Sequence, residues 1–185
     1  MSQCVWSSAA RLRGRVSLND DYEDLKDFFV EFLGVKMVDL AMAIDELKEA
    51  GSRQSTSRQE LKESIWTVNS LLSTTSKTPG PEQMLESRIF PIILPSGTPT
   101  ISSLATEFFV VDREKLSELY KTKVKFLDFP LQEVVTLGPF LNWMRLEARY
   151  LSHCVKEITS FHGGIARLTS NPERQIWNRA HALLR

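Results

Sequence analysis

Cysteine and long apolar runs are both scarce in this sequence, and each absence excludes a class of protein. Only Cys4 and Cys154 occur among the 185 residues, far apart and without the spacing of a metal site. A disulfide framework is therefore not indicated, and we expect an intracellular protein, cytoplasmic or nuclear. No apolar run approaches the ~18 residues that a membrane-spanning helix needs, so we expect no membrane partner.

The chain also has no net charge at neutral pH. Lys plus Arg and Asp plus Glu number 23 each, which makes the formal net charge zero. Proteins that bind polyanions carry a basic excess on one face, so we expect no nucleic-acid partner for the chain as a whole. The charge is uneven, however, because the first 18 residues contain Arg11, Arg13 and Arg15 and no acidic residue.

This basic first segment has three interpretations. A start that is rich in Arg and Ser and free of acids is typical of a mitochondrial presequence. A folded segment would instead be part of the domain, and we favour this interpretation. As an alternative, Trp6 with Arg11, Arg13 and Arg15 would make the segment a weak nucleic-acid binder with salt-dependent affinity.

Patterns for catalysis and cofactors are also missing. The sequence contains no C-x-x-C, H-x-x-x-H or H-E-x-x-H, which are common spacings of metal sites. Its one Gly-Gly pair, at residues 163–164, follows a predicted helix and lacks the lysine of a phosphate-binding loop. We therefore predict no catalytic residue, no metal and no cofactor.

One thiol arrangement remains as an alternative. His153 precedes Cys154, but neighbouring residues on a helix point about 100° apart. His162 lies eight positions further on and would reach Cys154 only if the chain folded back at Gly163. A thiol-dependent enzyme that uses Cys154 with His162 is thus the alternative, whereas the favoured prediction is a buried, structural Cys154.

Helical periodicity dominates the first part of the chain. An amphipathic helix is predicted from residue 20 to its stop at Gly34, and its apolar stripe consists of Leu25, Phe28, Phe29, Phe32 and Leu33. A second helix is predicted to end at Gly51. A third begins at the N-cap Ser57, because Glu60 follows at the spacing of a capping box.

The middle of the chain has the composition of loops and strands. STTSKTPGPEQ is the clearest loop. RIFPIILPSGTPTISS carries prolines at 91, 95 and 99, which favours edge strands around a turn at 95–97. FFVV at 108–111 is predicted as a buried strand, Asp112 as the N-cap of a short helix, and VKFLDF at 124–129 as another strand.

The last part is predicted to be helical. A helix after Pro130 is expected to stop at Gly138-Pro139, and one or two more follow up to Gly163. The final helix starts at Asn171 and reaches Arg185 without a stop signal, with an apolar side made of Ile176, Ala180, Leu183 and Leu184. Its unsatisfied carbonyls and its apolar stripe need a partner.

These elements predict an α+β fold that is predominantly α-helical, with a helical N-terminal part, a small β element in the middle and a helical C-terminal part. We expect one domain over residues 1–185 with two subregions, a helical one at 1–78 and an α+β one at 86–185, joined by a linker at about 74–85. Trp66 and Trp143 lie in apolar periodic stretches, which favours packing in the core.

The order of several segments resembles the C-terminal region of large fungal proteins related to sacsin and to the plant protein No Vein. The resemblance rests on CVWSSAARLRGRVSL, DLKDFFVEFLGV, LKESIWTVNSLL, RIFPIILPSG with FFVVDREKL, KFLDF and LGPFLNWMRLEARYLSHCVKE. Those proteins carry a GHKL-type ATPase in their N-terminal part. This sequence contains neither E-x-x-x-N nor D-x-G-x-G, so the resemblance implies no ATP hydrolysis and no catalytic residue here.

The expected function is therefore a non-catalytic protein-interaction or structural module, either a fragment or a short relative of a sacsin-like protein. Its partner is expected to be another protein or the rest of a larger parent chain. The residues predicted for an interaction surface are Trp6, Arg11, Arg13, Arg15, Trp177 and Leu184.

Overall fold

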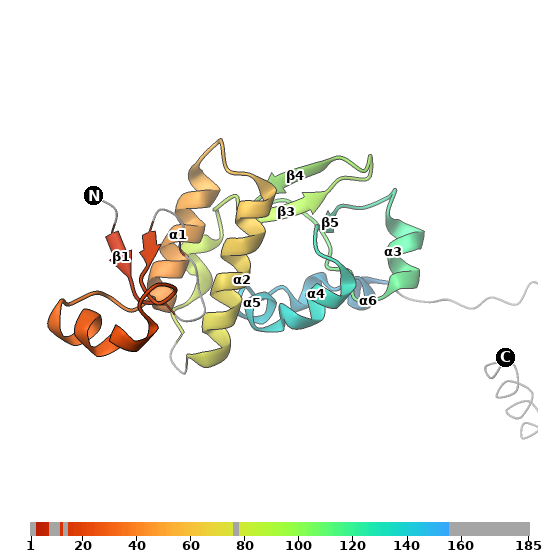
Figure 1. The fold of residues 1–185 in the computed structure, drawn as a ribbon. Coiled ribbons are helices and arrows are strands. Elements are labelled where there is room, and N and C mark those ends of the chain that lie inside the picture. The colour runs from red at the N-terminus through yellow and green to blue at the C-terminus, as the bar shows by residue number, and fades with distance from the viewer. Residues whose placement is uncertain (1–2, 8–11, 13–14, 76–77, 156–185) are drawn as a thin grey trace, which may run out of the picture.

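A computed structural model describes residues 3–7, 12, 15–75 and 78–155 and shows an α+β, mostly helical fold, as predicted (Figure 1). The expected final helix, with Trp177 and Leu184, lies outside the described residues, as do Arg11, Arg13 and His162. The elements in chain order are β1 (Gln3–Val5), β2 (Arg15–Ser17), η1 (Glu23–Leu25), η2 (Phe28–Phe32), α1 (Leu40–Ser52), α2 (Arg58–Thr74), η3 (Pro81–Met84), β3 (Phe90–Ile93), β4 (Pro99–Ser102), α3 (Glu114–Tyr120), β5 (Phe126–Leu127), α4 (Leu131–Thr136), α5 (Gly138–Trp143), η4 (Glu147–Arg149) and α6 (Leu151–Cys154).

The helices α1 and α2 pack side by side as an antiparallel pair (Figure 1). The predicted capping box of α2 is confirmed, because Glu60 N donates to Ser57 Oγ and Ser57 N donates to Glu60 Oε2. The predicted stop of α1 at Gly51 is wrong, since the helix continues to Ser52. Glycine is needed there because a Cβ at position 51 would lie 2.7 Å from Ile89 Cγ2.

The middle of the chain forms a three-stranded antiparallel sheet in the order β4-β3-β5. The strand that contains Pro91 is therefore central, whereas the prolines predicted an edge strand. Pro91 O accepts from Asp128 N on the β5 side, and the missing N–H of the proline faces the same side. Opposite Asp128 the proline has no N–H with which to return this bond, and the pairing with β5 is limited to the next two residues, Ile92 and Ile93.

The predicted strand at 108–111 is buried at Phe108, Val110 and Val111 but has only isolated bridges, Phe109 to Phe126 and Val110 to Tyr150. The prediction is thus confirmed in part: the segment is buried and makes two β-bridges, but it does not form a regular strand. Asp112 is also not the N-cap of α3, because Arg113 holds that position. The carboxylate of Asp112 accepts from the backbone N–H and the hydroxyl of Ser152 instead.

A buried asparagine connects α2 to the junction of α4 and α5. Gly138-Pro139, predicted as a stop, both follows α4 and begins α5, and α5 has no capping side chain of its own. Asn69, only 4% exposed, supplies one from another helix: its Oδ1 accepts from Phe140 N at 3.0 Å. Its Nδ2 donates to Thr136 O at 3.1 Å, so one side chain satisfies the end of α4 and the start of α5.

The main hydrophobic core contains residues from both sides of the predicted linker at 74–85. The ring of Phe90 on β3 lies at its centre, with centroid distances of 5.2 Å to Phe108 and 6.4 Å to Phe140. Within the expected linker, Met84 of η3 is fully buried. The two subregions therefore share one core.

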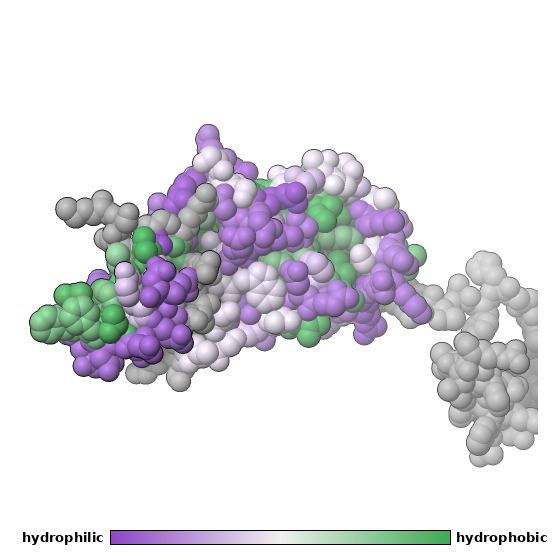
Figure 2. Space-filling view, in the orientation of Figure 1, coloured by the Kyte–Doolittle hydropathy of each residue, from purple (hydrophilic) through white to green (hydrophobic). Residues whose placement is uncertain are grey.

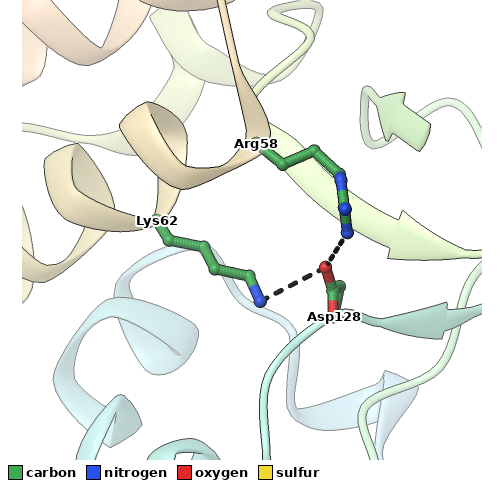
Figure 3. A network of polar contacts seen from close by, with 3 residues as sticks. All are labelled: Arg58, Lys62 and Asp128. Atoms are coloured by element: carbon green, nitrogen blue, oxygen red, sulfur yellow. Dashed lines mark hydrogen bonds and ion pairs between the residues drawn. The ribbon is translucent and has the colours of Figure 1, made fainter. Parts of the chain in front are cut away.

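A carboxylate at the end of β5 ties the sheet to the start of α2 (Figure 3). Asp128 Oδ2 lies 2.7 Å from Arg58 Nη1 and 3.2 Å from Lys62 Nζ. The ammonium of Lys62 also lies over the ring of Phe129, 5.1 Å from its centroid. The side chain of Asp128 is only 15% exposed, so solvent screens its ion pairs with Arg58 and Lys62 less than it screens an ion pair on the open surface.

The N-terminal part differs most from prediction, because it is not helical throughout. β1 and β2 form a parallel two-stranded sheet, and Trp6 continues β1 by a bridge to Met37. The predicted amphipathic α-helix from residue 20 is replaced by a short 3-10 helix, η1, and a π-helical turn, η2. Gly34, with φ of +67°, ends this segment as predicted.

Candidate interaction surface

An exposed cluster of large apolar side chains lies in the segment between β2 and α1. We call it the aromatic patch and define it as Tyr22, Leu25, Phe28, Phe32 and Leu33, which are 46%, 47%, 48%, 80% and 53% exposed. In Figure 2 apolar residues cover the outer tip of the region drawn from red to orange in Figure 1. Contiguous apolar exposure of this kind marks interaction sites in folded proteins.

The π-helical turn creates the patch. Leu33 N donates to Phe28 O, five residues back, so the turn is wider than an α-helical one. The rings of Phe28 and Phe32 stack with centroids 5.7 Å apart and planes at 15°. Phe29 lies beneath them, in contact with Phe28 at 5.5 Å and with Tyr22 at 5.3 Å. The outer aromatic rings are thus arranged on a shared base.

This base is fixed to the body of the protein through Trp6. The rings of Phe29 and Trp6 stack at 5.9 Å, and Trp6 is only 2% exposed. Its backbone N donates to Lys36 O, and its O accepts from Val38 N, both at 2.9 Å. The patch therefore belongs to a positioned element and is not a loosely attached tail.

The candidate surface consists of other residues than those predicted from the sequence. Trp6 was expected to contact a partner, but its side chain is buried and serves as the support of the patch. Arg15 is half-buried, and its Nη1 donates to Met42 Sδ at 3.5 Å. The basic first segment contributes β1 and β2 to the fold, which supports the interpretation as structure rather than presequence.

Acidic residues are interspersed in the sequence with those of the aromatic patch. In Figure 2 hydrophilic residues adjoin its apolar tip. Between residues 20 and 31 the only basic residue is Lys26, and the exposed carboxylates are those of Asp20, Asp21, Glu23, Asp24, Asp27 and Glu31. An apolar centre with a charged rim is the usual anatomy of a protein–protein interface.

Arg149 and Tyr150 have shifted pKa values, but both belong to the packing of the core. Burial lowers the pKa of the Arg149 guanidinium, and the charge of Glu107 partly opposes this shift. The guanidinium donates to Leu104 O and Thr106 O and lies over the ring of Phe108. Burial, and then the nearby carboxylates of Glu147 and Asp112, raise the pKa of the Tyr150 hydroxyl.

Cys154 is exposed, which corrects the prediction of a buried thiol. Its Sγ donates to Ala148 O at 3.3 Å, and His153 Nδ1 lies 2.9 Å from Glu147 O. Each side chain contacts a backbone carbonyl of η4. His162, the proposed base of the thiol-enzyme alternative, lies outside the described residues.

We expect native-state labelling with a disulfide reagent to modify both Cys4 and Cys154 without denaturant, because both thiols are exposed. The reaction is followed by the absorbance of the released thiolate, with the unfolded chain as the reference for two equivalents. Release of only one equivalent before unfolding would contradict the exposure of one thiol. A rate for Cys154 that falls sharply in His162→Ala would support the thiol-enzyme alternative.

A cavity of about 770 Å³ lies between the C-terminal end of α1, the loop before α2 and the residues that precede β3. It contains one unusual group, the buried Thr56 Oγ1, which has no hydrogen-bond partner. Its charged lining is balanced, with Asp45, Glu49 and Glu86 against Lys48, Arg53 and Arg88. Because neither sign dominates, the lining does not indicate a class of ligand.

Metal-binding clusters and membrane-spanning helices are both absent from the described residues. Within residues 3–7, 12, 15–75 and 78–155, no group of three or more His, Cys, Asp or Glu side chains could hold a metal ion. Nor is any helix in that part of the chain long and apolar enough to cross a membrane.

Comparison with known protein families gives a match over most of the described residues. Residues 41–155, more than half of the chain, match a family described as a domain of unknown function, DUF8348. The matched range runs from α1 through α6 and follows the aromatic patch in the sequence. No curated protein and no solved structure matches the chain.

Proposed function

The chain belongs to the family of the domain of unknown function DUF8348, and because this description names no activity, we propose a function from the surface of the molecule. We propose a non-catalytic protein-interaction module. Its aromatic patch binds a short amphipathic helix of a protein partner, with an apolar stripe on one side and Lys or Arg on the flanks.

The exposure of Phe32 is the observation that supports this proposal. At 80% it is the most exposed large apolar side chain among the described residues, and it stacks on a second exposed ring, Phe28. Covering one such side chain is worth about 2 kcal/mol. Aromatic anchors near the centre of an interface commonly dominate the binding energy, so a partner helix that covers both rings has a clear source of affinity.

The acidic rim selects the charge of the partner. The exposed carboxylates interspersed with the patch residues attract Lys and Arg and disfavour an acidic helix. An amphipathic helix places apolar residues at i, i+3, i+4 and i+7, which suits a compact patch on one short segment. This mode of recognition, a helix whose apolar stripe covers exposed aromatic residues, recurs among peptide-binding proteins.

The resemblance to sacsin-like and No Vein-like proteins gives this proposal a setting. In such a setting, nucleotide hydrolysis is the task of an ATPase region outside this sequence, because neither E-x-x-x-N nor D-x-G-x-G occurs here. The residues of this chain then bind the protein partner, and the aromatic patch determines which partner is bound.

A designed peptide tests the proposal. We expect a labelled 18-residue helix with a Leu stripe and Arg flanks to bind the full chain with micromolar affinity, measured by fluorescence anisotropy, and Phe32→Asp to weaken it by more than roughly 30-fold. Val135→Asp is the matched control, because Val135 is 77% exposed but lies on α4, and it should bind as the wild type does.

Two further peptides complete the design. A peptide of the same composition in scrambled order loses the apolar stripe, and a peptide with Glu in place of Arg reverses the charge; both should bind weakly. Equal affinity of all three peptides, or equal losses in Phe32→Asp and Val135→Asp, would contradict a specific site at the aromatic patch.

A further inference from the structure

We infer that the aromatic patch binds residues 171–185 of a second copy of this chain, so that the protein forms a reciprocal dimer. This inference rests on the proposed function, because it names the helix that the patch accepts. Three observations carry it: the pattern of the last segment, its charge, and the positions of the patch and of the end of α6.

The apolar pattern of the last segment fits the patch. Residues 171–185 read NPERQIWNRAHALLR, in which Ile176, Ala180, Leu183 and Leu184 fall on one side at helical spacing. The sequence places Pro172 after Asn171, which favours the start of a helix there. A short amphipathic helix is marginal alone in water, whereas the patch offers exposed rings that such a stripe would cover.

The charges of the two surfaces are complementary. The segment 171–185 carries Arg174, Arg179 and Arg185 against the single acid Glu173. The stretch 20–31, which contains most of the patch, has the opposite balance, with Lys26 as its only basic residue. Attraction between them speeds encounter and fixes orientation, and it weakens as salt is added.

The fold favours a second copy over the same chain as the source of the segment. In Figure 1 α6 lies at the end of the molecule opposite to the region with η1 and η2. The sequence predicts a helix up to Gly163, and a helix rises only about 1.5 Å per residue, which shortens the reach from Val155 to Asn171. A compact domain of this size is about 40 Å across. Two copies in reciprocal contact remove the need for a long return path and close the assembly.

Sedimentation velocity of the full chain over a wide concentration range tests the inference. We expect wild-type protein to pass from monomer to dimer, and Phe32→Asp and Leu184→Asp each to raise the apparent dimer Kd by more than roughly 30-fold. An equimolar mixture of the two variants should associate more than either alone, because one copy brings an intact patch and the other an intact final segment. Val135→Asp should dimerise as wild type does.

Other outcomes overturn the inference, and they separate it from the proposed function. A wild-type chain that is monomeric at every concentration overturns it, as does a Leu184→Asp variant that dimerises normally or a mixture that stays monomeric. If the wild type is monomeric and Leu184→Asp binds the designed peptide more tightly, the segment covers the patch of its own chain. If the designed peptide binds wild type and Leu184→Asp equally while both stay monomeric, the inference fails but the proposed function stands.

Discussion

Replacing Asn69 by alanine should lower the free energy of unfolding by about 3 kcal/mol, because two backbone groups in the interior lose their partner. The amide currently accepts from Phe140 N and donates to Thr136 O. Alanine can do neither, and the site is too buried for bulk water to replace both bonds. Urea denaturation followed by circular dichroism measures the loss as a lower midpoint at an unchanged slope.

The control for this variant is Asn142→Ala, which removes an exposed asparagine side chain from α5 itself. An exposed change of this kind should alter stability by less than about 0.5 kcal/mol. If both variants lost the same small amount, the bonds of Asn69 would have no measurable role at the junction of α4 and α5. A large loss in Asn69→Ala alone would establish that a side chain of α2 caps α5.

Phe90→Ala should cost about 4 kcal/mol, the typical loss for a fully buried phenylalanine. Its ring contacts Phe108 and Phe140, so alanine leaves a cavity where the sheet, the extended segment at 108–111 and α5 meet. The free energy of unfolding of a whole domain is only about 10 kcal/mol. The Phe90→Ala variant is therefore expected to be partly unfolded at elevated temperature. The same denaturation experiment measures it.

Phe32→Ala is the matched control for Phe90→Ala. Both variants remove the same atoms, but Phe32 is 80% exposed and Phe90 is fully buried. We expect Phe32→Ala to change the free energy of unfolding by less than about 0.5 kcal/mol. A loss close to that of Phe90→Ala would mean that the aromatic patch stabilises the fold, and it would argue against a surface kept for binding.

Local signals in the sequence predicted those elements whose ends are determined by neighbouring residues. The capping box of Ser57 and Glu60 placed α2 correctly, and the turn around Gly97 placed the hairpin of β3 and β4, because both devices act within a few residues. The mostly helical α+β class followed from the same periodicity.

Elements that depend on distant contacts could not be predicted this way. Periodicity over residues 20–34 indicated an α-helix with a buried stripe, but it cannot show that the stripe has no core to cover, or that Phe29 is held by Trp6. The capping of α5 by Asn69 could not be predicted either, because Phe140, which donates to Asn69, lies far along the chain. Pro91 was assigned to an edge because its use in a central strand depends on where β5 ends.

The candidate surface was missed for a related reason. The prediction favoured tryptophans and arginines as interaction residues, yet burial of Trp6 is decided by tertiary packing. A signal was present in the sequence: the apolar stripe of 20–34 is surrounded by carboxylates, and such a density of like charge favours an exposed segment. It indicated a surface element, whereas the aromatic residues alone indicated a core helix.

The bond between Asn69 and Phe140 also bears on the order in which the chain folds. It joins groups 71 positions apart, so a long loop must close before α5 gains its acceptor. A helix as short as α5 does not persist by itself in water. During synthesis α2 leaves the ribosome well before α5. We therefore expect α5 to become ordered only when α2 is in place to receive it, so that the first half of the domain is the template for the second half.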